Sequence, residues 1–122
     1  MNRSGEAVGE LMRFYKVSPK DLILIYDDLD LNTGQLRVKE RGGSGGHKGC
    51  ASVISSIGTE DFIKVRLGIG RPVPGNDIVG YVLSEFKREE LPVIETAVEN
   101  AAEAVRLIID NNISVAMNKY NQ

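Results

Sequence analysis

Three short segments of the chain show the hydrophobic patterns expected of β-strands. Residues 22–26 are a continuous apolar, partly β-branched run, which is typical of a buried strand. Residues 36–41 alternate between apolar-leaning positions and basic ones. Residues 62–69 alternate as well, with Lys64 and Arg66 placed between apolar side chains. The sequence therefore predicts one buried strand and two strands that each carry a basic face.

Between and after these strands, apolar residues recur at the spacing of one helix face. The predicted helices cover residues 4–16, 50–57, 77–83 and a long segment from about 88, with a last helical part that reaches residue 120. Pro92 fits the long helix only within its first turn. The predicted apolar stripes are Val8, Leu11, Met12 and Tyr15 on the first helix, and Ile94, Val98, Ala101, Val105, Ile108 and Ile109 on the long one.

Strands that alternate with helices indicate an α/β fold. We expect three layers, in which helices flank a mixed and mostly parallel sheet. The chain opens with the segment Asn-Arg-Ser-Gly at the start of a helix, and no strand precedes it. A sheet of three strands would leave apolar helix faces without partners. We therefore expect N-terminal elements of the fold to be missing upstream of Met1.

Length and composition indicate one soluble globular domain over residues 1–122, since 42% of the chain is hydrophobic and 26% is charged. No apolar run approaches the roughly 20 residues that a membrane helix needs. Cys50 is the only cysteine and cannot form an internal disulfide, which favours a reducing compartment. We expect a cytoplasmic protein that does not bind a membrane.

The charges are distributed unevenly along the chain. The formal net charge is only -2, which argues against an indiscriminate nucleic-acid binder. Residues 37–75, however, contain seven basic and three acidic residues, a net charge of +4. Residues 85–110 contain seven acidic and three basic residues, a net charge of -4. This distribution suits a protein that presents one basic face to an anionic ligand. Scattered, solvated charge is the alternative interpretation.

Residues 42–49 form the strongest local motif, because five of these eight residues are glycine. Glycines let the backbone approach a ligand closely, and the helix that follows adds amide donors and a favourable dipole for an anion. The segment lacks the Gly-Lys-Ser/Thr ending of a P-loop and the Gly-x-Gly-x-x-Gly spacing of a dinucleotide site. A small-molecule phosphate or nucleotide binder is therefore only weakly supported, and a flexible connector is the structural alternative.

His47, within that segment, is the only histidine of the chain. It either lines a site or caps the following helix. As a general base it would need an orienting partner, and one histidine with one cysteine cannot form a structural zinc site. No spacing supports a serine or cysteine nucleophile paired with it. We expect no metal site that involves this residue.

Three carboxylates, Asp27, Asp28 and Asp30, follow the predicted buried strand. Ligand sites in open α/β sheets lie beyond the carboxyl ends of the strands. A carboxylate in that place can orient an imidazole or bind a metal such as magnesium, whereas the alternative is a solvated turn.

The two basic strand faces offer a second candidate site. Arg37, Lys39 and Arg41 project from one strand, and Lys64 and Arg66 from the other. If the strands are neighbours, these side chains would form a groove for a phosphate backbone, and each contact would strengthen binding through counterion release. The alternative is a polar face that points to water.

Four blocks in register resemble the bacterial-type peptidyl-tRNA hydrolase family. They are Met1-Asn2-Arg3-Ser4-Gly5, residues 26–31 (Tyr-Asp-Asp-Leu-Asp-Leu), residues 45–49 (Gly-Gly-His-Lys-Gly) and residues 62–72, which end in Arg-Leu-Gly-Ile-Gly-Arg-Pro. The blocks stand in the order and at about the spacing of the family, and the resemblance covers essentially the whole chain. Each block alone is a weak signal, but four in register are specific.

The resemblance implies a phosphorylase/hydrolase-like fold and a monomer that hydrolyses the ester between peptide and tRNA in peptidyl-tRNA, which recycles tRNA during translation. It implies neither a metal nor a cofactor. The implied residue roles are Asp27 as the catalytic carboxylate that orients a histidine, Asn2, His47 and Lys48 as substrate-binding residues, and Arg37 and Arg66 as tRNA-binding residues. We expect these residues to border one pocket for the acceptor end of tRNA.

The chain departs from the family pattern in two ways. Lys48 stands where the family usually has asparagine, so the contact made there changes from an amide to a cation. The catalytic histidine and another substrate-binding asparagine of the family would lie upstream of Met1, so the chain alone is expected to have little or no activity. A non-catalytic RNA-binding module on the same fold is the alternative function, although the carboxylate of Asp27 favours an enzyme.

Overall fold

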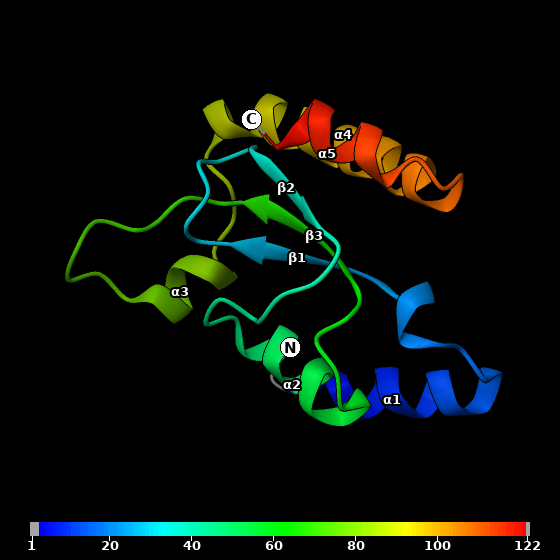
Figure 1. Ribbon diagram of the computed structural model, residues 1–122. Helices are drawn as coiled ribbons and strands as arrows, with labels where there is room; N and C mark the ends of the chain where they lie inside the picture. Colours follow the sequence, from blue (N-terminus) through cyan, green and yellow to red (C-terminus); the bar gives the residue numbers. More distant parts are fainter. Residues whose placement is uncertain (1–2, 122) are drawn as a thin grey trace. The chain divides into compact units, whose positions relative to one another are not determined.

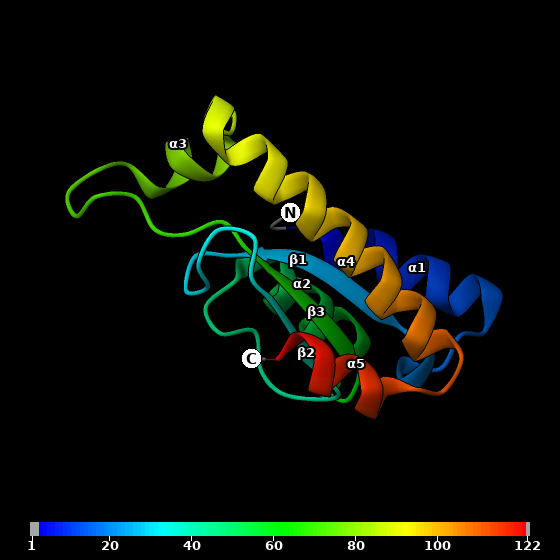
Figure 2. The ribbon, with the colours of Figure 1, turned by 90° about the horizontal axis from the view of Figure 1, so that it is seen from above.

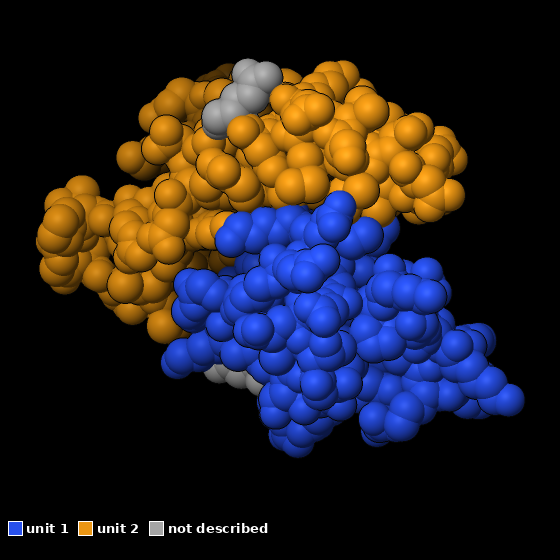
Figure 3. All heavy atoms as spheres, in the orientation of Figure 1, with its two compact units in different colours: residues 1–26, 39–65 blue, residues 27–38, 66–122 orange. Residues whose placement is uncertain are grey.

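The computed structural model describes residues 3–121, which divide into two compact units (Figure 3). Unit 1 comprises residues 3–26 and 39–65, and unit 2 comprises residues 27–38 and 66–121. Each strand of the sheet contributes residues to both units. That the whole chain is one domain stays a prediction.

Three strands form the sheet, namely β1 (Ile23–Asp28), β2 (Leu36–Lys39) and β3 (Ile63–Gly68). Their order is β1-β3-β2. The arrows of β1 and β3 point the same way and that of β2 points the opposite way, so one neighbouring pair is parallel and the other antiparallel (Figure 1). The α/β class with a mixed sheet is thereby confirmed, and β1 continues two residues beyond the predicted run.

Unit 1 contains the helices α1 (Ser4–Tyr15) and α2 (Lys48–Ile57), which pack against each other, and the 3₁₀ turn η1 (Pro19–Asp21) (Figure 1). Gly5 lies at the contact of the two helices. Its amide donates a hydrogen bond to Ser52 Oγ at 3.0 Å, and a Cβ at this position would overlap the carbonyl oxygen of Ser52. The core of this unit consists of Tyr26, Cys50, Val53 and Phe62.

Unit 2 contains most of the C-terminal half of the chain. Its helical elements are α3 (Ile78–Leu83), η2 (Arg88–Glu90), α4 (Leu91–Ile109) and α5 (Ile113–Tyr120). Helices α4 and α5 lie side by side in both views (Figure 1, Figure 2). Lys119 Nζ of α5 lies 2.5 Å from Glu103 Oε1 of α4. Their hydrogen bond lowers the pKa of the Glu103 carboxyl and raises the pKa of Lys119.

The side chain of Asn121 fastens the residues after α5 to β2. Its Oδ1 accepts the amide hydrogen of Val38 at 2.6 Å, and its Nδ2 donates to the carbonyl of Val38 at 2.7 Å. Both polar groups of the Val38 backbone are thereby satisfied by one side chain.

The predicted apolar stripes need two corrections. On α1, Met12 is buried as predicted, but Leu11 and Tyr15 are 57% and 68% exposed. On α4, Val98 and Ile109 are 56% and 67% exposed. The buried stripe of α4 consists of Ile94, Ala97, Ala101, Ala104 and Ile108. The prediction favoured large apolar side chains, whereas alanines let a neighbouring helix approach closely.

Among residues 3–121, none of the helices combines the length and the apolar character required to span a bilayer.

Candidate functional site

Asp27 and Asp28 are the last two residues of β1, at its carboxyl end. Successive side chains of a strand point to opposite faces of the sheet. Asp28 is only 8% exposed, whereas Asp27 is half-buried. The structure thus places Asp27 at a strand end, as the sequence predicted, and its neighbour points to the other face.

Asp28 forms an ion pair with Arg66 of β3. Arg66 Nη2 lies 2.5 Å from Asp28 Oδ2, and the two side chains are 17% and 8% exposed. Oδ2 receives no well-aligned hydrogen bond within the described residues, so the attraction at this oxygen is chiefly electrostatic. The other oxygen, Oδ1, accepts the amide hydrogen of Asp30 at 2.8 Å. Both oxygens of the Asp28 carboxylate therefore have a partner, a backbone amide for Oδ1 and the guanidinium of Arg66 for Oδ2.

The turn that follows β1 is held against the end of β3. The Ile69 amide donates to the Asp28 carbonyl at 3.0 Å, and the Gly70 amide donates to the Leu31 carbonyl at 3.0 Å. Gly68 fits between them, since a Cβ there would overlap Leu31 and the carbonyl of Asn32. These contacts explain why a glycine stands at position 68.

The glycine-rich segment lies in unit 1 and leads directly into α2. Gly42, Gly45 and Gly46 have φ angles of +126°, +59° and +87°, which favour glycine. His47 is the N-cap of α2, because its Nδ1 accepts the amide hydrogen of Cys50 at 3.0 Å. The capping interpretation of His47 is confirmed. Lys48 is the first residue of the helix and is exposed.

The cap also determines what His47 can do chemically. When Nδ1 accepts a hydrogen bond, the neutral imidazole carries its hydrogen on Nε2 and can donate from that atom. Its ring lies 4.7 Å from the ring of Tyr26, centroid to centroid, at an angle of 50°. His47 therefore has one nitrogen committed to the helix and is not arranged as a proton acceptor. Asn2, the third predicted substrate-binding residue, lies outside the described residues.

The basic strand faces differ from the prediction. On β2, Arg37 is half-buried and Lys39 is exposed, while Arg41 lies exposed beyond the strand. Within residues 3–121, Arg37 forms no ion pair, whereas Arg66 on β3 is paired with Asp28. The interpretation of Lys64 as part of an exposed basic face is wrong, because Lys64 is fully buried.

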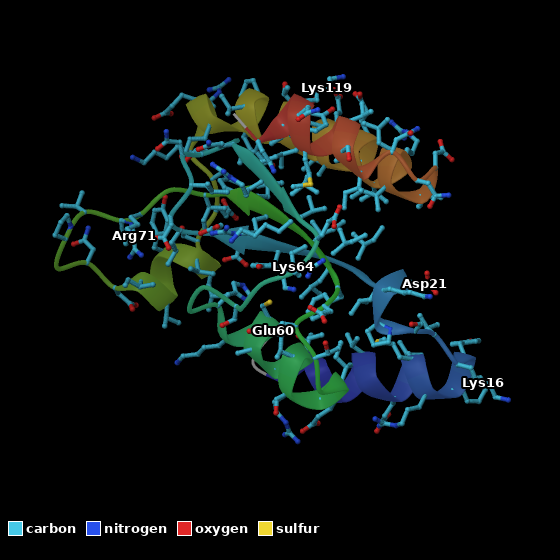
Figure 4. All side chains as sticks on the ribbon, viewed as in Figure 1. Lys16, Asp21, Glu60, Lys64, Arg71 and Lys119 are labelled. Carbon is cyan, nitrogen blue, oxygen red and sulfur yellow. The ribbon has the colours of Figure 1, made fainter. Side chains whose placement is uncertain are left out.

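Lys64, which is labelled in Figure 4, donates its hydrogen bonds to backbone groups of its own segment. Its Nζ donates to the carbonyls of Glu60 at 2.6 Å and Phe62 at 3.0 Å, and it lies 3.7 Å from the centroid of the Phe62 ring. Desolvation by burial lowers the pKa of Lys64 from its ordinary value. An alternating pattern does not reveal such burial, since a long basic side chain on a strand normally reaches water.

The carboxylates of Asp27, Asp28 and Asp30, at the end of β1 and just after it, do not gather into a metal site. In the described part of the chain, no group of three or more histidine, cysteine, aspartate or glutamate side chains is placed to hold a metal ion. Asp28 is paired with Arg66, and Asp30 forms an exposed ion pair with Arg71, which is labelled in Figure 4. These carboxylates are therefore used by cations of the chain itself.

Sequence reasoning named Asp28 as one of three acids but missed its pairing with Arg66. The two residues are far apart in the sequence, and only the parallel pairing of β1 with β3 brings them together. The adjacent acids at the strand end were the available signal, because alternation sends one of them into the molecule.

Comparison with known proteins identifies the family. The family model for peptidyl-tRNA hydrolase matches residues 1–122. The chain belongs to the peptidyl-tRNA hydrolase family. Curated members with similar sequences include the peptidyl-tRNA hydrolases of Desulfitobacterium hafniense strain Y51, 47% identical over 122 residues, and Staphylococcus haemolyticus strain JCSC1435, 45% identical over 122 residues.

A solved structure of the family has the same fold. The crystal structure of peptidyl-tRNA hydrolase from Acinetobacter baumannii is 34% identical and matches 99% of this chain with a TM-score of 0.90. The chain spans 66% of the D. hafniense relative, 64% of the S. haemolyticus relative and 61% of the A. baumannii chain.

Proposed function

We propose that the chain carries part of an enzyme that hydrolyses the ester bond between peptide and tRNA in peptidyl-tRNA, which recycles tRNA during translation. The observation that carries this proposal is the family match over all 122 residues. The likeness in fold to the A. baumannii enzyme supports it.

In the proposed reaction, Asp27 orients the imidazole of a histidine that acts as general base. The histidine takes a proton from water as the water oxygen attacks the ester carbonyl. The bond from the carbonyl carbon to the ribose oxygen then breaks, and the proton passes to that oxygen. A carboxylate that fixes the tautomer of the imidazole and stabilises its cation acts as the aspartate of serine proteases does.

His47 is not the general base of this proposal. Its Nδ1 accepts the Cys50 amide, so taking up a proton at that nitrogen would break the cap of α2. We assign the base to a histidine outside these 122 residues, because the chain has no second histidine. We propose that His47, Asn2 and Lys48 bind substrate.

Arg37 and Arg66 are the proposed contacts to tRNA phosphate. Arg37 supports this role more directly, because it is half-buried on β2 and forms no ion pair with another residue in 3–121. Each lysine or arginine that neutralises a phosphate makes binding more sensitive to salt. Lys48 adds a further positive charge at the start of α2.

A chimera tests the proposed function. It consists of this chain in place of the matching part of the D. hafniense relative, which supplies the remaining segment. We expect the chimera to release peptide from peptidyl-tRNA and the isolated 122-residue chain to show negligible turnover. Asp27→Asn in the chimera should lower kcat by a factor on the order of 10⁴, because the imidazole would lose its orienting carboxylate.

The D. hafniense enzyme itself is the control for the assay, and circular dichroism checks that the chimera is folded. A folded chimera that binds tRNA without hydrolysing peptidyl-tRNA would favour the RNA-binding module instead. Turnover by the isolated chain close to that of the control would contradict the roles assigned to Asp27 and to the external histidine.

We further propose that the protein acts as a monomer in the cytoplasm, with residues 1–122 inside one domain and with neither metal nor cofactor. The sheet shared by both units supports a single domain. Light scattering of the chimera measures its mass, and hydrolysis in the presence of a chelator tests the metal requirement.

A further inference from the structure

We propose that Arg66 is a positioning residue, which acts through Asp28 to hold Asp27 in place. The inference rests on the proposed function, since it assumes that Asp27 orients a catalytic histidine. Arg66 then has a role in addition to its proposed contact with phosphate. Asp28, which has no role in the proposed reaction above, connects Arg66 to Asp27.

Three contacts fix Asp28. Its carbonyl accepts the Ile69 amide at 3.0 Å, its Oδ1 accepts the Asp30 amide at 2.8 Å, and its Oδ2 lies 2.5 Å from Arg66. The first of these contacts comes from the residue after β3, the second from the turn after β1, and the third from β3 itself. The backbone and the side chain of Asp28 are thus held by three contacts.

The strand geometry of β1 couples Asp28 to Asp27. Asp27 and Asp28 share a peptide bond at the end of β1, and adjacent side chains of a strand point to opposite faces. A rotation of the Asp28 backbone therefore rotates the peptide that carries Asp27. When Asp28 is held on one face, the direction of the Cα–Cβ bond of Asp27 towards the other face is restricted as well.

The ion pair of Asp28 and Arg66 is largely buried. Asp28 is 8% exposed and Arg66 is 17% exposed, so water compensates neither charge fully. A buried carboxylate that loses its cation has to find new partners or move towards water. Because Asp28 belongs to the end of β1, such a movement displaces the strand end where Asp27 lies.

The two arginines that are proposed to contact phosphate differ in their partners. Arg37 has no ion pair with another residue in 3–121, whereas one side of the Arg66 guanidinium faces Asp28. The loss of Arg37 should therefore affect the binding of tRNA, and the loss of Arg66 should affect the catalytic step. Measurements of kcat and of tRNA affinity therefore distinguish the two roles.

The experiment uses the chimera described above and four variants, Arg66→Gln, Asp28→Asn, the double variant and Arg37→Gln. Asp28→Asn keeps the oxygen that accepts the Asp30 amide and removes the attraction to Arg66. Arg71→Gln is the matched control, because Arg71 also pairs with an aspartate of this segment but the pair is exposed. The measurements are kcat and KM on peptidyl-tRNA, and the affinity for tRNA as a function of salt.

For Arg66→Gln and Asp28→Asn we expect kcat to fall roughly 10- to 100-fold, as for a displacement of about 1 Å in a catalytic group. KM should change little in Asp28→Asn, whereas Arg66→Gln also loses its proposed phosphate contact and should raise KM. The double variant should be no slower than the worse single variant, because both changes break one interaction. Arg37→Gln should raise KM and lower the salt slope by about one, with kcat unchanged. Arg71→Gln should leave both constants unchanged.

Two results would overturn the inference. One is an Arg66→Gln variant that behaves like Arg37→Gln, with a lower salt slope and an unchanged kcat. The other is a double variant whose loss in kcat is the product of the two single losses, which means that Arg66 and Asp28 act independently. Thermal unfolding of each variant identifies losses caused by unfolding, and Arg66→Lys, which keeps a cation near Asp28, should recover part of kcat.

A separate measurement distinguishes failure of the inference from failure of the proposed function. The amide resonance of Asp27 in the 122-residue chain should shift in Arg66→Gln and in Asp28→Asn, but not in Arg37→Gln. If it shifts while the chimera is inactive on peptidyl-tRNA, the proposed function fails and the positioning contact stands. If it does not shift, the positioning role is wrong whatever the activity.

Discussion

Lys64 and Arg66 are two residues apart on β3, and their positive charges have different kinds of partner. Lys64 is fully buried, and its ammonium donates to two carbonyls within four residues of it. Arg66 is nearly buried, and its guanidinium pairs with a carboxylate on another strand. One cation is satisfied by the local backbone and the other by a partner far away in the sequence.

This difference in partners determines which parts of the protein depend on each residue. The partners of Lys64 are neutral carbonyls, so desolvation dominates and lowers the pKa of Lys64. Arg66 is matched by an opposite charge, and the match links β3 to the end of β1. A change at Lys64 should therefore have local consequences, whereas a change at Arg66 should reach the segment that contains Asp27.

The largest loss of stability is expected for Arg66→Ala. It leaves the carboxylate of Asp28 buried without its cation, and breaking a buried pair in this way costs about 3–5 kcal/mol. Urea unfolding of the chimera measures the difference in the free energy of unfolding. Asp28→Asn combined with Arg66→Ala should recover part of the loss, and a loss of Arg66→Ala below that of Lys64→Met would contradict the comparison.

For Lys64→Met we expect a smaller loss in the free energy of unfolding, about 1–3 kcal/mol at neutral pH. The carbonyls of Glu60 and Phe62 lose their donor, which destabilises the protein. The substitution also removes a charge that is kept away from water, which offsets part of this loss. The pH dependence sharpens this prediction. Between the lowered pKa of Lys64 and its ordinary value of 10.5, the unfolded chain binds more protons than the native chain, so Lys64 makes stability rise with pH.

The measurement is the free energy of unfolding of both proteins between neutral pH and pH 10.5. The advantage of the parent protein over Lys64→Met should grow as pH rises through that window, since methionine does not titrate. A constant or shrinking advantage would show that Lys64 keeps an ordinary pKa when buried.

The smallest effect is expected for Arg71→Ala. Arg71 pairs with Asp30, but the two side chains are 57% and 53% exposed. Exposed ion pairs contribute roughly 0–1 kcal/mol. Unfolding in low and high salt should give nearly the same small difference, and a loss as large as that of Arg66→Ala would mean that exposure does not separate the two pairs.

The sequence predicted the elements well because their patterns are local. The three strands and the helices α1, α2, α3, α4 and α5 lie at the predicted places, and Pro92 lies in the first turn of α4. The cap of α2 was among the alternatives because a histidine beside glycines precedes the helix. Periodicity and capping act over a few residues, which is the range that a sequence pattern records.

The remaining features depend on contacts that no local pattern records. The burial of Lys64 contradicts the alternation of basic and apolar residues on β3, since it depends on the path of the preceding turn. The pairing of Asp28 with Arg66 depends on which strands are neighbours. The alanine stripe of α4 depends on the close approach of other elements, and alanine gives only a weak apolar signal.

The double hydrogen bond of Asn121 has a consequence for how the sheet ends. Among the described strands, β2 is at the border of the sheet, where unpaired amides and carbonyls invite strands of other molecules. A carboxamide offers a donor and an acceptor, as a peptide group does. Asn121 therefore forms with the amide and carbonyl of Val38 the two hydrogen bonds that an additional strand would form. A single side chain near the end of the chain thereby keeps one position of this border from recruiting a foreign strand.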